Sequence, residues 1–105
     1  MIKELTVESV PGGVRVRLPR DIDHHSAKYM REEIDTAIAK LMPKRLILDF
    51  SDVAFMDSSG VGLVMGRVEG SKRYGGVVEL TGLSDGIMRL MRICGVDKLE
   101  EVYIK

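Results

Sequence analysis

The chain has 105 residues, of which 45% are hydrophobic and 30% charged, enough to bury one core and too few for two domains of ordinary size. Sixteen Lys and Arg residues balance sixteen Asp and Glu residues, without a basic block, which disfavours nucleic acid as a partner. We therefore expect a single domain over residues 1–105 that binds neither DNA nor RNA.

The chain begins with the pattern of a β-hairpin. Apolar and polar residues alternate over residues 5–10 and again over residues 14–18, as in strands with one exposed face. Pro11-Gly12-Gly13 interrupts the alternation and predicts the turn between the two strands.

A helix is predicted after Pro19, followed by a buried strand. Apolar residues recur at spacings of three, four and seven, which indicates one buried stripe formed by Ala27, Met30, Ile34, Ala37, Ile38 and Leu41. Pro43 ends this helix. The continuous apolar run within residues 45–50 is typical of a central strand covered on both faces, and so favours a parallel sheet.

The segment 51–60 leads into a second helix, whose predicted buried stripe is Val61, Val64, Met65 and Val68. The glycine pair at 75–76 ends this helix. Three further glycines stand four residues apart within it, where each costs up to about 1 kcal/mol relative to alanine. We therefore expect close packing against the sheet or a partner at Gly62, Gly66 and Gly70.

The last third predicts a strand, a helix and a short apolar tail. Residues 77–80 form the strand, and Ser84 or Asp85 caps a helix that Gly95 terminates. The predicted buried face of this helix is Ile87, Leu90, Met91 and Cys94. Residues 102–104 form either an edge strand or a covering tail. Helices and strands that alternate after a hairpin predict an α/β domain with a mixed sheet.

Two loops, residues 20–25 and 52–60, form the candidate site because loops at the carboxyl ends of strands carry ligands in α/β sheets. If their strands are parallel and adjacent, one surface receives Asp21, Asp23, His24, His25, Asp57, Ser58 and Ser59. Asp23 is as well suited to cap a helix as to recognise a partner. A hydroxyl at a helix N-terminus is well placed to carry a phosphate, because free amides and the helix dipole tolerate the charge.

The sequence contains little that would indicate an enzyme or a metal site. The chain has no G-x-S-x-G nucleophile elbow, no G-K-[ST] phosphate loop and no dinucleotide fingerprint, since Met65 takes the place of its last glycine. Histidines and carboxylates do not have metal-ligand spacing. We expect no catalytic residues, no cofactor and no metal.

Two segments carry a family resemblance. Asp21-Ile22-Asp23-His24-His25 and the longer run from Phe55 to Gly62, with Asp57-Ser58-Ser59-Gly60 at its centre, resemble the characteristic segments of bacterial anti-sigma factor antagonists of the STAS-domain family, particularly those of sporulation. The likeness covers essentially the whole chain. It implies a single domain with a mixed four- or five-stranded sheet and helices packed against it.

The resemblance also implies a partner-switching regulator of transcription. The unphosphorylated antagonist binds an anti-sigma factor that is an ATP-dependent serine kinase and so releases a sigma factor. Phosphorylation of the first serine, here Ser58, ends binding, and a serine phosphatase reverses it. The implied partner-binding residues are Asp23, His24, Asp57, Ser58, Ser59 and Gly60. Arg20 departs from the glycine that relatives commonly have and bears on the geometry of its turn.

The sequence leaves other functions open. The domain could be a STAS docking subunit of another assembly, such as a stress-signalling complex or a lipid-transport machine. An aspartyl-phosphate receiver would use Asp49 or Asp57 with magnesium at Asp21 and Asp23, but a chain of this length has little room for five βα units. A nucleotide-binding module is disfavoured by the missing phosphate loop.

The sequence also predicts the compartment. The single cysteine, Cys94, cannot form an internal disulfide, which favours a reducing environment. No apolar run approaches the roughly 20 residues of a membrane span, and residues 1–4 do not resemble a leader. We expect a cytoplasmic protein without a membrane partner.

Overall fold

The predicted hairpin is present in the computed structural model, which describes residues 5–105. Strands β1 (Thr6–Val10) and β2 (Gly13–Arg17) pair antiparallel, with Glu8 opposite Arg15. Gly12 has a φ of 77° in the turn between them, a conformation that glycine adopts without strain. The hairpin supplies one edge of the main sheet.

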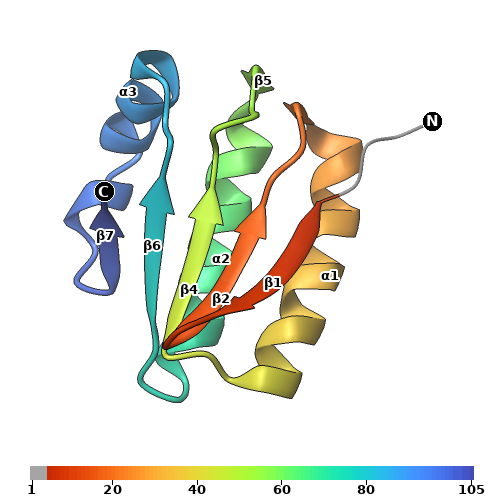
Figure 1. The fold of residues 1–105 in the computed structure, drawn as a ribbon. Coiled ribbons are helices and arrows are strands. Elements are labelled where there is room, and N and C mark those ends of the chain that lie inside the picture. The colour runs from red at the N-terminus through yellow and green to blue at the C-terminus, as the bar shows by residue number, and fades with distance from the viewer. Residues whose placement is uncertain (1–4) are drawn as a thin grey trace.

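The main sheet has five strands in the order β1-β2-β4-β6-β7 (Figure 1). Strand β4 (Arg45–Asp49) lies between β2 and β6 (Val77–Thr81), and β7 (Val102–Ile104) is the second edge. All pairs except β1–β2 are parallel. The mixed sheet is therefore confirmed with five strands, and the C-terminal segment is an edge strand rather than a covering tail.

Helices α1 (His24–Leu41) and α2 (Ser58–Lys72) pack side by side behind the sheet in Figure 1. Helix α1 ends at Met42, which has a φ of 41°, directly before Pro43. Helix α3 (Asp85–Ile93) is capped by Ser84, whose Oγ accepts a 3.2 Å hydrogen bond from the amide of Ile87. A 3-10 turn, η1 (Val96–Lys98), connects α3 to β7.

One hydrophobic core lies between the sheet and the helices. Its fully buried side chains come from β2, β4 and β6 on one side and from all three helices on the other, and include Val16, Leu46, Leu48, Val78, Leu80, Ile34, Val64, Val68 and Met91. Three residues assigned to buried stripes are instead exposed, namely Leu41, Met65 and Cys94. Leu41 lies in the last turn of α1, Met65 borders the stripe of α2, and Cys94 follows the last turn of α3, so none of them reaches the sheet.

The predicted packing of the α2 glycines against the sheet is wrong. A Cβ built on Gly62 or Gly66 would meet nothing within 4 Å, and one on Gly70 would make only ordinary contact with Ile38 at 3.9 Å. Gly62 instead lines a hollow shared with α1, and Gly70 is also nearest to α1. Contact with a partner remains the other explanation.

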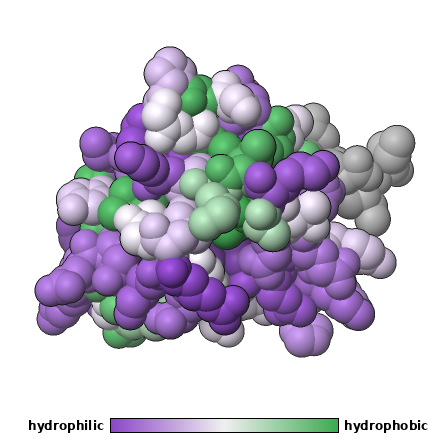
Figure 2. Space-filling view, turned by 90° about the horizontal axis from the view of Figure 1, so that it is seen from below, coloured by the Kyte–Doolittle hydropathy of each residue, from purple (hydrophilic) through white to green (hydrophobic). Residues whose placement is uncertain are grey.

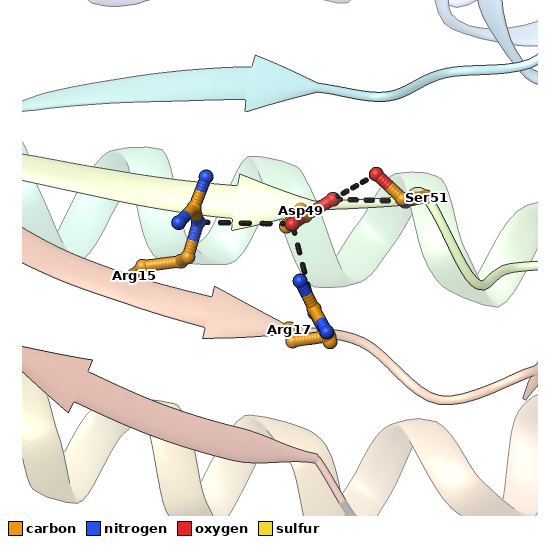
Figure 3. A network of polar contacts seen from close by, with 4 residues as sticks. All are labelled: Arg15, Arg17, Asp49 and Ser51. Carbon is orange, nitrogen blue, oxygen red and sulfur yellow. Dashed lines mark hydrogen bonds and ion pairs between the residues drawn. The ribbon is translucent and has the colours of Figure 1, made fainter.

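The second face of the sheet carries a charged network instead of a helix (Figure 3). Oδ1 of Asp49 accepts hydrogen bonds from the amide and hydroxyl of Ser51 at 2.9 and 2.6 Å, and Oδ2 lies 3.7 and 3.8 Å from Nε of Arg15 and Arg17. Burial alone would raise the pKa of the Asp49 carboxyl, but the Ser51 bonds and the two arginines outweigh it and lower this pKa. Central strand β4 is thus buried on both sides, as predicted, although on this face polar side chains cover it.

We expect Asp49→Asn to lower the free energy of unfolding by about 1 kcal/mol at pH 7, because two guanidinium groups lose their counter-charge. The lowered pKa means that this stabilisation is present at neutral pH and is lost as the pH falls through the folded-state value, below 3.8. Urea denaturation at pH 7 and pH 3 measures the effect. Asp52→Asn is the control, since Asp52 is exposed. An equal deficit for Asp49→Asn at both pH values would contradict the assignment.

Figure 2 shows the end of the molecule at which the parallel strands begin, opposite to their carboxyl ends. This end is mostly hydrophilic, with a limited apolar patch in its middle. The exposed side chains of Leu41 and Met42 lie where α1 ends. Within residues 5–105, no helix has the length and apolar character needed to cross a membrane.

Candidate functional site

The two candidate loops are joined by a small parallel sheet that sequence reasoning did not predict. Strand β3 (Asp21–Ile22) pairs with β5 (Phe55–Met56), with Ile22 opposite Met56. The carbonyl of Arg20 accepts hydrogen bonds from the amides of Ala54 and Phe55 at 2.7 and 3.1 Å. The turn at Arg20 is therefore held through its backbone, while its side chain is exposed.

The pairing sets the N-termini of α1 and α2 next to each other. The amide of Asp57 donates to the carbonyl of Ile22 at 3.2 Å, so Asp23 and Asp57 each follow a paired strand and precede a helix. Both aspartates are helix N-caps. Two helix N-termini, each with partial positive charge, thus open onto one surface.

Asp23 forms a reciprocal capping box with Ser26. Oδ1 of Asp23 accepts from the Ser26 amide at 2.9 Å, and the Ser26 hydroxyl oxygen accepts from the Asp23 amide at 3.0 Å. The hydrogen bond from the Ser26 amide is the main reason that the pKa of the Asp23 carboxyl is lowered, against a smaller opposing effect of burial. The capping function of Asp23 is a structural fact, and its recognition function remains a prediction.

Ser58 and Ser59 occupy the first two positions of α2 but differ in exposure. Ser58 is exposed, whereas Ser59 is half-buried and its amide donates to Oδ1 of Asp57 at 2.8 Å. A group that must reach the hydroxyl of Ser58 therefore meets no obstruction from the helix itself. Of the two serines, Ser58 is the more accessible to a second protein.

Gly60 is buried directly beneath Met56. A Cβ at Gly60 would collide with Cγ and Sδ of Met56. The missing side chain lets the end of β5 fold closely over the first turn of α2. The glycine of the Asp57-Ser58-Ser59-Gly60 segment is thus explained by the close approach of Met56.

A hollow of about 530 Å³ lies between the N-terminal halves of α1 and α2 and is lined in part by Ser59. Its lining residues are His24, His25, Ala27, Lys28, Tyr29, Arg31, Ser59, Gly62 and Leu63. Sequence reasoning missed Lys28, Tyr29 and Arg31. The spacing of four and then three residues from His24 to Lys28 to Arg31 could have predicted this, because residues at that spacing lie on one helical face.

The candidate residues Asp21, Asp23, His24, His25, Asp57, Ser58, Ser59 and Gly60 therefore occur at one end of the molecule, as predicted from the two loops. The rings of His24 and His25 meet edge to face, with centroids 5.9 Å apart. Across residues 5–105, no group of three potential metal-ligating side chains comes together. The arrangement offers two capped helix N-termini and an accessible hydroxyl.

The chain matches the model of the STAS domain family over residues 4–104. It is 29% identical over 100 residues to the anti-sigma F factor antagonist of Paenibacillus polymyxa, covering 95% of this chain and 86% of that protein. It is 30% identical over 92 residues to the anti-sigma-B factor antagonist of Bacillus subtilis, covering 88% of this chain and 83% of that protein.

Two solved structures of the anti-sigma factor antagonist SpoIIAA, the second described as a Bacillus cell fate determinant, have a similar fold. The unphosphorylated form matches with a TM-score of 0.82 and 30% identity, covering 96% of this chain and 87% of the other. The phosphorylated form matches with a TM-score of 0.75 and 30% identity, covering 96% and 90%. The likeness extends over the sheet and helices together, so it includes the end at which the candidate residues lie.

Proposed function

The chain belongs to the STAS domain family, and on that premise we propose that it is an anti-sigma factor antagonist switched by phosphorylation of Ser58. The unphosphorylated form binds an anti-sigma factor that is an ATP-dependent serine kinase, which frees a sigma factor. The kinase then phosphorylates Ser58 and ends the complex, and a serine phosphatase regenerates the binding form. The observation that carries this proposal is the exposed Ser58 at the start of α2, directly after the capping Asp57.

A phosphate on Ser58 suits this position for two physical reasons. The N-terminus of α2 presents free amides and positive partial charge, so the domain tolerates the added group. The phosphate adds about −1.5 to −2 charges to a surface that already carries Asp57. The fold is therefore retained while the surface offered to the partner changes. In SpoIIAA, the phosphorylated and unphosphorylated forms both match the present fold.

We expect phosphate transfer to Ser58 alone when the chain is incubated with its anti-sigma factor kinase and MgATP. Ser58 is exposed, whereas Ser59 is half-buried against the hollow. A pull-down with the kinase, followed by mass spectrometric peptide mapping, tests both binding and the site. Ser59→Ala should still accept one phosphate, and Ser58→Ala should accept none.

Hydroxylamine treatment separates this proposal from an aspartyl-phosphate receiver, because the reagent cleaves acyl phosphates and leaves phosphoserine intact. Loss of the label with hydroxylamine, or a label on Ser59, would contradict the assignment to Ser58. Failure of the kinase to bind the parent chain would contradict the proposed function itself.

We expect Asp23→Asn to separate capping from recognition. Asparagine caps helices about as well as aspartate, so the melting temperature should stay almost unchanged. Loss of the carboxylate charge should weaken kinase binding by about tenfold, equivalent to about 1.4 kcal/mol. Calorimetric titration and thermal melting of the same samples measure the two effects. If Asp23→Asn bound the kinase with unchanged affinity, Asp23 would act only as a helix cap and not in recognition.

A further inference from the structure

The hollow between α1 and α2 lies one residue from Ser58 and has features that capping does not explain. Ser59 forms part of its wall, and Lys28 and Arg31 of α1 form another part. The side chains of Lys28 and Arg31 are exposed, and within residues 5–105 neither takes part in an ion pair. The hollow therefore has two cationic groups available to a second molecule.

The electrostatic surroundings of the hollow favour an anionic occupant. None of its nine lining residues is acidic. The first turns of α1 and α2 also contain no acidic residue, and the nearest carboxylates in the sequence are those of the capping Asp23 and Asp57 and of the exposed Asp21. Asp35, one turn beyond Arg31, is held by Arg67 at 2.8 Å. This excess of positive charge is local, because the whole chain has a formal charge of zero.

The shape and remaining lining of the hollow favour a protein segment over a small ion. Gly62 contributes no side chain, and a Cβ there would meet nothing within 4 Å. The backbone of α2 is therefore open to a second molecule at this position. Tyr29 is 69% exposed and stands at the rim. Exposed tyrosine and arginine next to open backbone are typical of protein-protein contact surfaces.

We propose that this hollow is the docking surface for an acidic segment of the anti-sigma factor partner, so that Lys28 and Arg31 pair with its Asp or Glu side chains. This inference rests on the proposed function and adds the chemistry of the partner. The surface around Ser58 then carries both signs of charge, with the capping carboxylates of Asp23 and Asp57 close to the basic hollow that Ser59 helps to line. Such a pattern sets the orientation in which the partner approaches Ser58.

Charge reversal at the hollow tests the proposal in the complex. We expect the double variant Lys28→Glu/Arg31→Glu to bind the purified anti-sigma factor kinase at least about tenfold more weakly than the parent at low salt, with a smaller difference at high salt. The matched control is Lys44→Glu/Lys98→Glu, which makes the same change in net charge at two exposed lysines outside the hollow. Equal affinities of the two double variants would overturn the docking surface while leaving the proposed function intact.

A second measurement uses the isolated chain and does not depend on the kinase. We expect hexaglutamate to shift the backbone NMR signals of residues 24–31 and 59–63, and hexalysine to leave them in place. The double variant at Lys28 and Arg31 should lose the response. Absence of shifts with hexaglutamate, or equal shifts with inorganic phosphate alone, would overturn the inference. Failure of the parent chain to bind the kinase would instead count against the proposed function.

Discussion

Ser58→Asp is expected to bind the anti-sigma factor kinase about a hundredfold more weakly than the parent. An unpaired charge next to Asp57 on a surface that loses water on binding costs up to about 3 kcal/mol. Since about 1.4 kcal/mol corresponds to a factor of ten, this is on the order of a hundredfold in affinity. Isothermal titration calorimetry with ADP present measures the change.

The stability of Ser58→Asp should barely differ from that of the parent. Ser58 is the exposed first residue of α2, where a carboxylate gains roughly 0.3 to 1 kcal/mol from the helix dipole. This gain offsets part of the repulsion from Asp57. A lower affinity therefore reports on the interface and not on unfolding.

Two neutral substitutions complete this experiment. Ser58→Asn has a similar size to Ser58→Asp without the charge and should bind within a few-fold of the parent. Ser58→Ala should bind and remain bound when ATP is added, because it cannot accept the phosphate. If Ser58→Asp and Ser58→Asn bound equally well, negative charge would not be the switch.

The main elements of the fold could be predicted because their burial follows a simple period. The apolar stripe that includes Met30, Ile34 and Ile38 predicted helix α1, and the apolar run at residues 46–48 predicted strand β4. Residues that stop helices predicted where they end, as Pro43 does for α1 and Gly95 for α3. These signals are local in sequence, so a single chain reveals them.

The features that escaped prediction depend on contacts between distant segments. Strands β3 and β5 have two residues each, too few for an alternation, and form only because the loops meet. The burial of Asp49 depends on arginines more than 30 residues away in the sequence. The hollow depends on the way α1 packs against α2.

The segment Asp57-Ser58-Ser59-Gly60 has one feature that the sequence predicted and one that it did not. Its position at the start of a helix was predicted and is confirmed, although Ser58, Ser59 and Gly60 already belong to α2 and the short strand β5 before them was not predicted. The contact of Gly60 with Met56 was not predicted, because the side-chain packing over a helix start has no sequence period. That contact makes Gly60 different from the other glycines of α2.

Gly60→Ala is expected to lower the free energy of unfolding by about 1 kcal/mol, because the cost of displacing the half-buried side chain of Met56 exceeds the gain in helix propensity. Because Met56 directly precedes the capping Asp57, we also expect phosphorylation of Ser58 to slow. Gly66→Ala is the matched control in the same helix. Its Cβ would meet nothing within 4 Å, so it should stabilise the protein by up to about 1 kcal/mol through helix propensity.

A double-mutant cycle with Met56→Ala assigns the effect of Gly60→Ala to this one contact. Removing the Met56 side chain destabilises the protein by itself, but it also vacates the space that the new methyl group needs. In the Met56→Ala background, Gly60→Ala should therefore cost nothing or stabilise by up to about 1 kcal/mol, which gives a coupling free energy of about 1 to 2 kcal/mol. Urea denaturation of the four proteins measures this coupling. Additive effects would show that Gly60 is required for its backbone conformation or for the partner, and not for the packing of Met56 over the start of α2.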